Sequence, residues 1–80
     1  MIRVLYFARL RDQLGVSSEE IEATPATVAE LIGQLSARGE AWASTFSGTV
    51  LVAVNQELAD PATAIEDGDE IGFFPPVTGG

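Results

Sequence analysis

The sequence predicts a small α+β domain in which a mixed sheet of four to five strands carries one main helix on one face. Strand-like segments stand at both ends of the chain, and one strongly amphipathic segment lies between them. No internal repeat or low-complexity stretch interrupts the 80 residues. An apolar content of 46% is enough for a single core, and the length leaves no room for a second domain.

The first strand is expected over residues 1–8, where side chains alternate between two partly apolar faces. One face consists of Ile2, Val4 and Tyr6, and the other of Arg3, Leu5 and Phe7. Arg3 indicates that the second face is open at one end, which would leave Leu5 and Phe7 as exposed hydrophobes for a partner. The alternative is that loops of the same chain cover them.

Two short elements are expected next. Leu10 and Leu14 stand four residues apart ahead of Gly15, which predicts one or two helical turns closed by a glycine. Residues 16–23 are acidic and alternate only weakly, which is typical of a solvated strand at a sheet edge.

The main helix is predicted to begin at Thr27, which forms a capping box with Glu30, and to end at Gly39. Its apolar face repeats at helical spacing through Val28, Leu31, Ile32 and Leu35. Trp42 and Phe46 are again four residues apart, so a further helical turn with its aromatic side chains on the core is expected, with a loop as the alternative.

The second half of the chain reads as strands and turns. Residues 50–54 form a continuous β-branched run, which predicts a strand buried on both faces. Residues 55–59 suggest a turn and a possible short strand carrying Leu58. Ile65 is expected to anchor the loop that follows in the core, and Gly68 to supply a positive φ in the acidic turn 66–69.

The last strand is predicted over residues 70–74, with Ile71 and Phe73 on one face and Gly72 and Phe74 on the other. A β-grasp roll fits this order of elements best. It leaves one sheet face bare, and the pleat gathers Leu5, Phe7 and Phe74 on that face. The domain is therefore predicted over residues 1–74, followed by a flexible extended tail over residues 75–80.

The composition excludes several classes of function and partner. A net charge of −8 would repel a nucleic-acid backbone. The chain has no cysteine, no histidine and no lysine, so its serines have no side-chain base to activate them, and an autonomous active site is not expected. The acidic turn 66–70 lacks the spacing of a calcium loop and is interpreted as solvated rather than as a metal site. The absence of cysteine, of a signal peptide and of a membrane span favours the cytoplasm and no membrane partner.

The absence of lysine has two interpretations that the sequence leaves open. One is a genome-wide preference for arginine. The other is protection of an activated acyl group, because a chain without lysine and cysteine side chains has few groups that would attack it.

The C-terminal tail has the properties of a presented carboxylate. Pro75 and Pro76 lack backbone donors, so the strand must stop at Phe74 and continue as a stiff segment. Residues 75–80 reach roughly 20 Å when extended. Gly79 and Gly80 have no side chains, which permits entry into a narrow channel and close approach to a nucleotide. An ionised terminal carboxylate is a poor electrophile, and a mixed anhydride with AMP would activate it.

These residues carry a family resemblance. The run 68–80, which ends Phe-Phe-Pro-Pro-Val-Thr-Gly-Gly, resembles the C-terminus of the small subunit of molybdopterin synthase, the MoaD family. The opening residues 1–8 and the segment 52–56 are also similar, so the resemblance covers essentially the whole chain. It implies a ubiquitin-like β-grasp fold and a sulfur carrier without an active site of its own in a two-subunit enzyme.

The resemblance also implies a reaction cycle. An adenylating partner that uses ATP and magnesium would convert the Gly80 carboxylate to an acyl-adenylate, and a sulfur donor would make it a thiocarboxylate. No cofactor would be bound permanently, and the covalent sulfur on Gly80 would be the cargo. The large synthase subunit would then take the tail into its active site, and sulfur would pass to cyclic pyranopterin monophosphate to build the molybdopterin dithiolene. In this family the synthase is a heterotetramer.

Residue by residue, the resemblance assigns the sulfur to Gly80 and the rest of the tail to Pro75, Pro76, Val77, Thr78 and Gly79. It assigns partner contacts to Phe7, Leu58, Phe74 and Arg11, and the pleat adds Leu5. Two alternatives remain from the sequence: a sulfur carrier for thiamin synthesis or tRNA thiolation, and a ubiquitin-like protein modifier that forms an isopeptide through Gly80.

Overall fold

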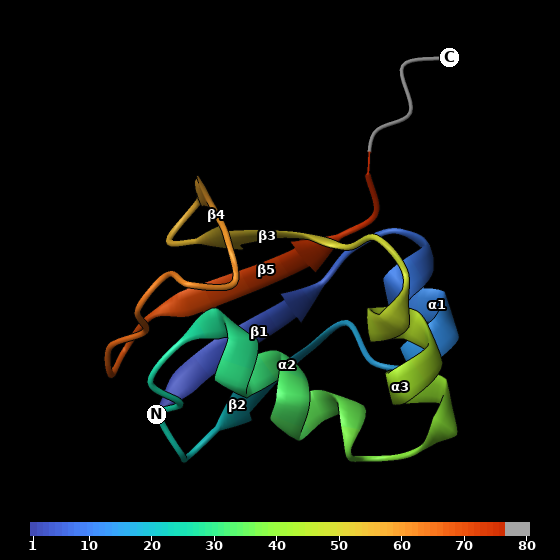
Figure 1. Cartoon of the computed structure of the whole chain (residues 1–80), viewed down its shortest axis with the longest axis horizontal. Coiled ribbons are helices and arrows are strands. Elements are labelled where there is room, and N and C mark those ends of the chain that lie inside the picture. Colours follow the sequence, from blue (N-terminus) through green and yellow to red (C-terminus); the bar gives the residue numbers. More distant parts are fainter. Residues whose placement is uncertain (77–80) are drawn as a thin grey trace.

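The computed structural model describes residues 1–76 and contains a five-stranded mixed sheet with three helices (Figure 1). The strands are β1 Ile2–Tyr6, β2 Ser18–Ile21, β3 Leu51–Val54, β4 Glu57–Ala59 and β5 Glu70–Phe74. The helices are α1 Arg9–Leu14, α2 Val28–Ser36 and α3 Glu40–Ser47. The strand order is β2-β1-β5-β3-β4. This is the predicted β-grasp arrangement, and the fold class is confirmed.

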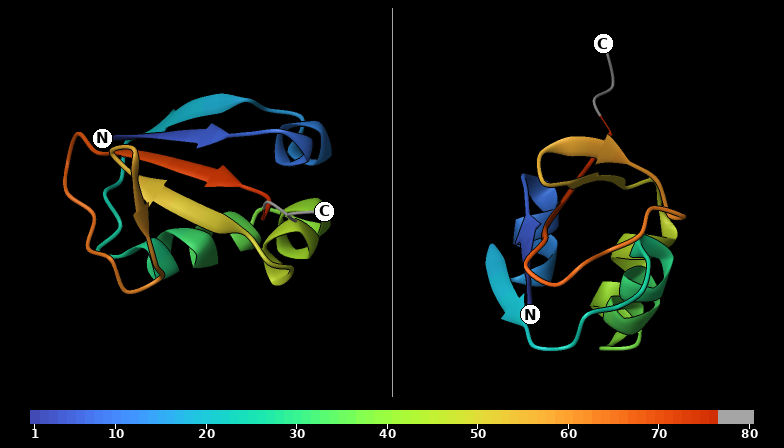
Figure 2. Two further views of the ribbon diagram at one scale, coloured as in Figure 1. Left: turned by 90° about the horizontal axis from the view of Figure 1, so that it is seen from above. Right: turned by 90° about the vertical axis from the view of Figure 1, so that its left-hand side faces the viewer.

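The sheet places β5 at its centre. β5 runs parallel to β1 and antiparallel to β3, while β2 and β4 form the two edges. Figure 2 shows α2 and α3 along one face of the sheet, with α1 at the end of β1. The predicted edge strand, the short helix closed by Gly15 and the final strand at residues 70–74 are all confirmed.

The core lies between this sheet face and the helices. Ile2, Val4 and Tyr6 are buried, as the pleat predicts, and so are Ile71 and Phe73. They meet the buried face of α2, formed by Val28, Leu31 and Leu35, together with Ile65 as the predicted anchor. The Phe73 ring packs against Tyr6 and Phe46, with centroids 6.2 and 5.0 Å apart. The central strand thus anchors the whole core.

Two helical predictions are settled by local contacts. The Thr27 hydroxyl accepts a hydrogen bond from the Glu30 N–H at 3.2 Å, which confirms the N-cap, while the Glu30 carboxylate accepts from the Ala26 N–H at 3.4 Å. Residues 40–47 form a helix rather than a loop. Trp42 and Phe46 are half-buried and pack against the core.

One prediction is wrong. In β3 only Val52 is buried, and Leu51, Ala53 and Val54 are half-buried. The helices cover one side of the sheet, so alternate residues of β3 face the uncovered side. A continuous apolar run does not distinguish this situation from burial on both faces.

A polar cluster ties the edge strand β2 to the segment after α2. The Glu19 carboxylate accepts two hydrogen bonds from the Arg38 guanidinium, at 2.7 and 2.8 Å, and one from the Tyr6 hydroxyl at 2.8 Å. The guanidinium lies over the Trp42 ring, 4.7 Å from its centroid. Burial and the neighbouring carboxylate raise the pKa of Tyr6, so its hydroxyl stays protonated as a donor.

The hydrogen bonds from Arg38 lower the pKa of Glu19, although burial partly opposes this effect. The stability of the fold should therefore depend on pH. A depressed carboxyl pKa stabilises the fold above the unfolded-state pKa, about 4.3, and that stabilisation is lost as pH falls through the lower folded-state pKa. We expect Glu19→Gln to lower the unfolding midpoint at pH 7, with the difference from the parent shrinking below about pH 4. Denaturant titrations across this range test it. Glu20→Gln, whose exposed carboxylate lies 3.8 Å from Arg3, is the matched control and should change little.

The β3–β4 hairpin has a two-residue turn in which Asn55 and Gln56 both have positive φ, 52° and 69°. This pattern belongs to type I′ turns, which favour glycine at the second position. Gln56→Gly is therefore expected to raise the free energy of unfolding by about 0.5–1 kcal/mol. Asn55→Gly is the contrasting variant, because the Asn55 side chain bonds the Asp69 carboxylate and the Glu70 N–H, and it should destabilise. Chemical denaturation of both variants tests the assignment, and a loss of stability in Gln56→Gly would contradict it.

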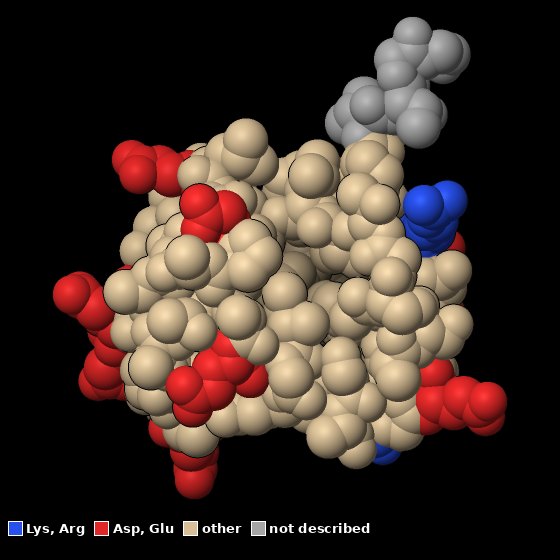
Figure 3. All heavy atoms as spheres, in the orientation of Figure 1, with Lys and Arg blue, Asp and Glu red and all other residues tan. Residues whose placement is uncertain are grey.

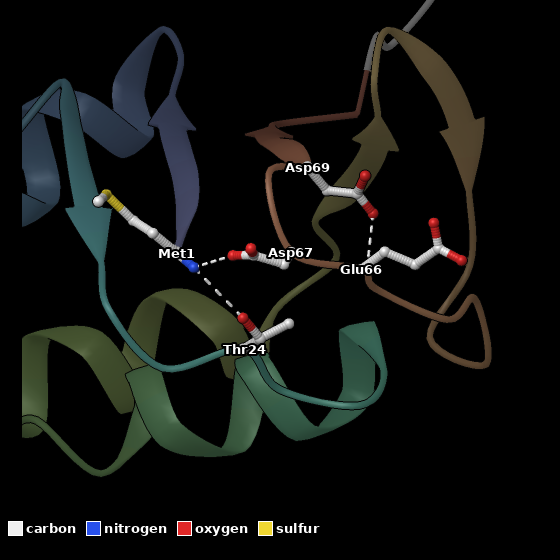
Figure 4. A network of polar contacts seen from close by, with 5 residues as sticks. All are labelled: Met1, Thr24, Glu66, Asp67 and Asp69. Carbon is white, nitrogen blue, oxygen red and sulfur yellow. Dashed lines mark hydrogen bonds and ion pairs between the residues drawn. The ribbon is translucent and has the colours of Figure 1, made fainter.

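The acidic turn before β5 is held by its own carboxylates (Figure 4). Asp67 pairs with the α-amino group of Met1, which lowers the pKa of Asp67 by hydrogen bonding and charge. Asp69 accepts a hydrogen bond from the Glu66 N–H at 2.8 Å, and Gly68 has the predicted positive φ of 89°. Within residues 1–76, no group of three potential ligands is arranged to hold a metal ion. Nor does any helix in that range have the length and apolar character needed to cross a membrane.

Candidate functional site: the open sheet face and the root of the tail

The C-terminal segment leaves from the central strand of the sheet. β5 pairs with β1 through Tyr6 and Phe73, and with β3 through Leu51 and Phe74, up to its last residues. Pro75 and Pro76 follow, half-buried and outside any strand, as the missing proline donors require. The predicted sites Val77, Thr78, Gly79 and Gly80 lie outside the described residues, so the extent and flexibility of the tail stay predictions.

The sheet face opposite the helices is apolar. The strand registers align Leu5, Gly72, Ala53 and Leu58 in one row across β1, β5, β3 and β4. Phe74 and Leu51 form the next row, nearer the root of the tail. We call the six apolar side chains of this surface the docking face: Leu5, Phe7, Leu51, Ala53, Leu58 and Phe74.

The docking face holds two of the three large hydrophobic residues that are exposed in residues 1–76, Phe7 at 48% and Leu58 at 75%. Leu5 and Phe74 beside them are half-buried. Such a cluster has no partner within the described part of the chain, which is the signature of a protein-binding surface. The structure thus brings Leu58, predicted only from resemblance, onto the surface that the pleat predicted for Phe7 and Phe74.

Arg11 lies on α1, outside the strands that carry most of the docking face. Figure 3 shows basic side-chain atoms near this helix, which contains both Arg9 and Arg11. Its exposed guanidinium lies 4.0 Å from the Asp12 carboxylate, a weak pairing between neighbours in sequence. Because α1 follows directly after β1, which is parallel to β5, Arg11 is at the same end of the sheet as the root of the tail. A basic side chain at this rim suits contact with an acidic partner group.

Sequence reasoning missed two residues of this surface and one contact, since it placed Gly72 on the face of Phe74 but did not predict the ring above it. Leu51 and Ala53 belong to it by register, which periodicity within one strand cannot supply. Gly72 lies under the Phe7 ring: a Cβ built on Gly72 would be 3.1 Å from the Phe7 Cε2 atom. A single glycine in a strand is the only sequence signal that could have pointed to such a close approach.

The described residues offer no catalytic constellation. A groove of about 390 Å³ between α1 and α3 is lined by Arg9, Gln13, Ser44, Thr45 and Thr49, among others. Hydroxyl groups without an adjacent base are not nucleophiles at neutral pH. The exposed apolar docking face, rather than this groove, is therefore the candidate functional site.

Comparison with known proteins agrees with this geometry. The family model described as "ThiS family" matches residues 4–80. A molybdopterin synthase sulfur carrier subunit from Haemophilus influenzae is 43% identical over 81 residues, covering 100% of both chains.

Two solved structures extend the comparison. Small archaeal modifier protein 1 (SAMP1) from Haloferax volcanii has a TM-score of 0.79 at 29% identity, with 99% of this chain and 98% of that chain covered. In a protein–protein complex of subunits 1 and 2 of the molybdopterin-converting factor from Helicobacter pylori, the matching chain has a TM-score of 0.71 at 28% identity, covering 99% and 97%. This chain belongs to the ThiS family, within the group of molybdopterin synthase sulfur carrier subunits (MoaD).

Proposed function

We propose that this protein is the sulfur carrier subunit of a molybdopterin synthase and that it delivers sulfur on its C-terminal Gly80. The observation that carries the proposal is the root of the tail: the chain leaves the central strand β5 at Phe74, a residue of the docking face, and continues into Pro75 and Pro76. A partner that covers this face would receive the tail at a fixed place. Full-length identity of 43% to a carrier subunit supports the same function.

The chemistry occurs at the carboxylate of Gly80. One of its oxygens attacks the α-phosphorus of ATP on an adenylating partner, which releases pyrophosphate and leaves an acyl-adenylate. Hydrosulfide supplied by the sulfur donor then attacks the carbonyl carbon, displaces AMP and loses its proton, so one oxygen of the carboxylate is replaced by sulfur. ATP and magnesium belong to the adenylating partner in this scheme, and the thiocarboxylate is the cargo.

The large synthase subunit is the partner that accepts this cargo and passes it to cyclic pyranopterin monophosphate. A relative's complex of subunits 1 and 2 supports such a pairing. The docking face supplies its contact surface, with Leu5, Phe7, Leu58 and Phe74 as apolar contacts and Arg11 at the rim. The proposal also includes the heterotetramer of the family, an adenylating enzyme, a sulfur donor and a cytoplasmic location.

Intact-mass analysis of the protein isolated from its own sulfur-replete cell tests the function. We expect a fraction of molecules with one oxygen replaced by sulfur, located by fragmentation to the C-terminal peptide. Thiocarboxylate should disappear when the adenylating enzyme is deleted. A homogeneous unmodified carboxylate in both strains would refute the carrier function.

The likeness to SAMP1 keeps a second function in view, that of a protein modifier attached through Gly80. In that case the same cells would contain high-mass conjugates that are lost when Gly80 is deleted. Carrier activity predicts thiocarboxylate without such conjugates.

A further inference from the structure

We propose that Gly72 is a positioning residue of the docking face: its bare Cα provides the seat that holds the Phe7 ring in the orientation that the partner binds. Gly72 stands in the middle of β5, between Leu5 on β1 and Ala53 on β3. The inference rests on the proposed function, because it assigns how one residue prepares the surface for the partner.

The backbone of Phe7 is held on both sides. Its N–H donates to the Phe73 carbonyl at 3.0 Å, which extends the β1–β5 pairing by one bond, and its carbonyl accepts from the Leu10 N–H at 3.2 Å. Ala8 follows with φ 55° and ψ −133°, a conformation that residues other than glycine rarely adopt, and its carbonyl accepts from the Arg11 N–H at 3.1 Å. The chain therefore turns sharply after Phe7, and the remaining freedom is that of the ring.

The ring lies over Gly72. A Cβ built there would be 3.1 Å from the Phe7 Cε2 atom, closer than most real Cβ contacts, and 3.8 Å from Cδ2, an ordinary van der Waals distance. Phe7 lies two residues beyond Leu5, the partner of Gly72, so its ring reaches back diagonally across the strand pair. Gly72 is buried although it belongs to the uncovered face, because this ring covers it.

Position 72 requires glycine because a side chain would collide with a neighbour, and not because the backbone has an unusual conformation. Gly15 and Gly68 have positive φ and open space around their Cα atoms, whereas Gly72 is not among the positive-φ residues and has a ring against it. Any L-residue other than proline would suit the backbone of this central strand. A Cβ at this position would instead displace the Phe7 ring by a few tenths of an ångström from its present place.

The seat lowers the entropic cost of binding. Phe7 remains 48% exposed, so part of the ring faces the partner while another part contacts Gly72. A side chain already held in its bound orientation loses less freedom on association. Displacing the ring should therefore weaken docking without unfolding the domain.

Gly72→Ala tests the seat in two measurements. On the free protein, proton NMR should show contacts between the Phe7 ring and the Gly72 α-protons, together with a ring-current shift of those protons that is absent in Phe7→Ala. In Gly72→Ala the ring resonances should move, while the unfolding midpoint stays equal or rises, because alanine suits a strand better than glycine does.

Titration against the large synthase subunit is the second measurement. Gly72→Ala should raise Kd about three- to tenfold. In the Phe7→Ala background the same substitution should change Kd little, since there is no ring left to displace. Gly33→Ala is the matched control, because Gly33 is exposed on α2 with nothing within 4 Å of a built Cβ, and its Kd should equal that of the parent.

The outcomes separate this inference from the proposed function. The positioning role would be overturned by an equal Kd for the parent and Gly72→Ala. It would also be overturned if Gly72→Ala weakened binding by the same factor in the parent and in the Phe7→Ala background. Missing ring contacts in the free parent would overturn the seat itself. A parent protein that shows the ring contacts but binds no large subunit would refute the proposed partner instead.

Discussion

A chain extended by one alanine after Gly80 is expected to lose sulfur transfer completely while it keeps its fold and its docking. The extension moves the carboxylate by one residue and replaces the Gly80 carboxylate with an ordinary peptide bond. A peptide carbonyl at Gly80 can neither form the acyl-adenylate nor carry the sulfur. Displacing a reacting group by a few ångströms generally lowers the reaction rate by a large factor, because the reacting atoms must be held near attack distance.

Three measurements on the extended chain test this expectation. Mass spectrometry after incubation with the adenylating enzyme, ATP and a sulfur source should show no thiocarboxylate, and molybdopterin formation in the reconstituted synthase should be abolished. The Kd for the large subunit should stay within a fewfold of the parent. Full molybdopterin formation with this variant would eliminate both the carrier and the modifier that act through the Gly80 carboxylate. A single alanine placed before Met1 is the control, since it lies at the opposite end of the sheet.

Phe73→Ala and Phe74→Ala form a matched pair with opposite expected effects. Phe73 is fully buried against Tyr6 and Phe46, so its truncation should cost about 3–5 kcal/mol of unfolding free energy. A small domain has about 5–15 kcal/mol in total, so this loss is large. Phe74 is half-buried on the docking face, and its truncation should weaken partner binding by about 2 kcal/mol with a modest effect on folding.

Denaturant titration and binding to the large subunit measure the two effects separately. Binding of Phe73→Ala is compared under conditions in which it is still folded. If Phe74→Ala unfolds as readily as Phe73→Ala, then Phe74 is part of the core and the assignment of the docking face is wrong. If Phe74→Ala binds as tightly as the parent, the partner uses another surface.

Much of this fold follows from local patterns in the sequence. The alternation in residues 2–6 predicts which side chains of β1 are buried, and the capping box at Thr27 predicts where α2 begins. The two faces of β5 follow from the same alternation, so Phe7 and Phe74 could be placed on one surface before the strand order was known. A periodic pattern of apolar residues thus predicts on which face of a strand or helix each side chain lies.

What the sequence leaves out depends on register and on unusual backbone. Leu58 and Ala53 share the docking face because they pair across the β3–β4 hairpin, a contact that no single strand encodes. The positive φ of Ala8 has no sequence signal, since alanine is typical of regular structure. The half-buried state of β3 was missed because composition does not report whether a sheet is covered on one side or both.

The position of Met1 has a practical consequence. The chain has no lysine, so the α-amino group of Met1 is the only primary amine of its 80 residues. It pairs with Asp67 in the turn before β5, whereas the root of the tail lies at the other end of that strand. Amine-reactive coupling should therefore tether the protein at a single point, with the root of the tail at the other end of the central strand from the support. Such an oriented layer would let immobilised carrier be presented to its partners in a defined direction.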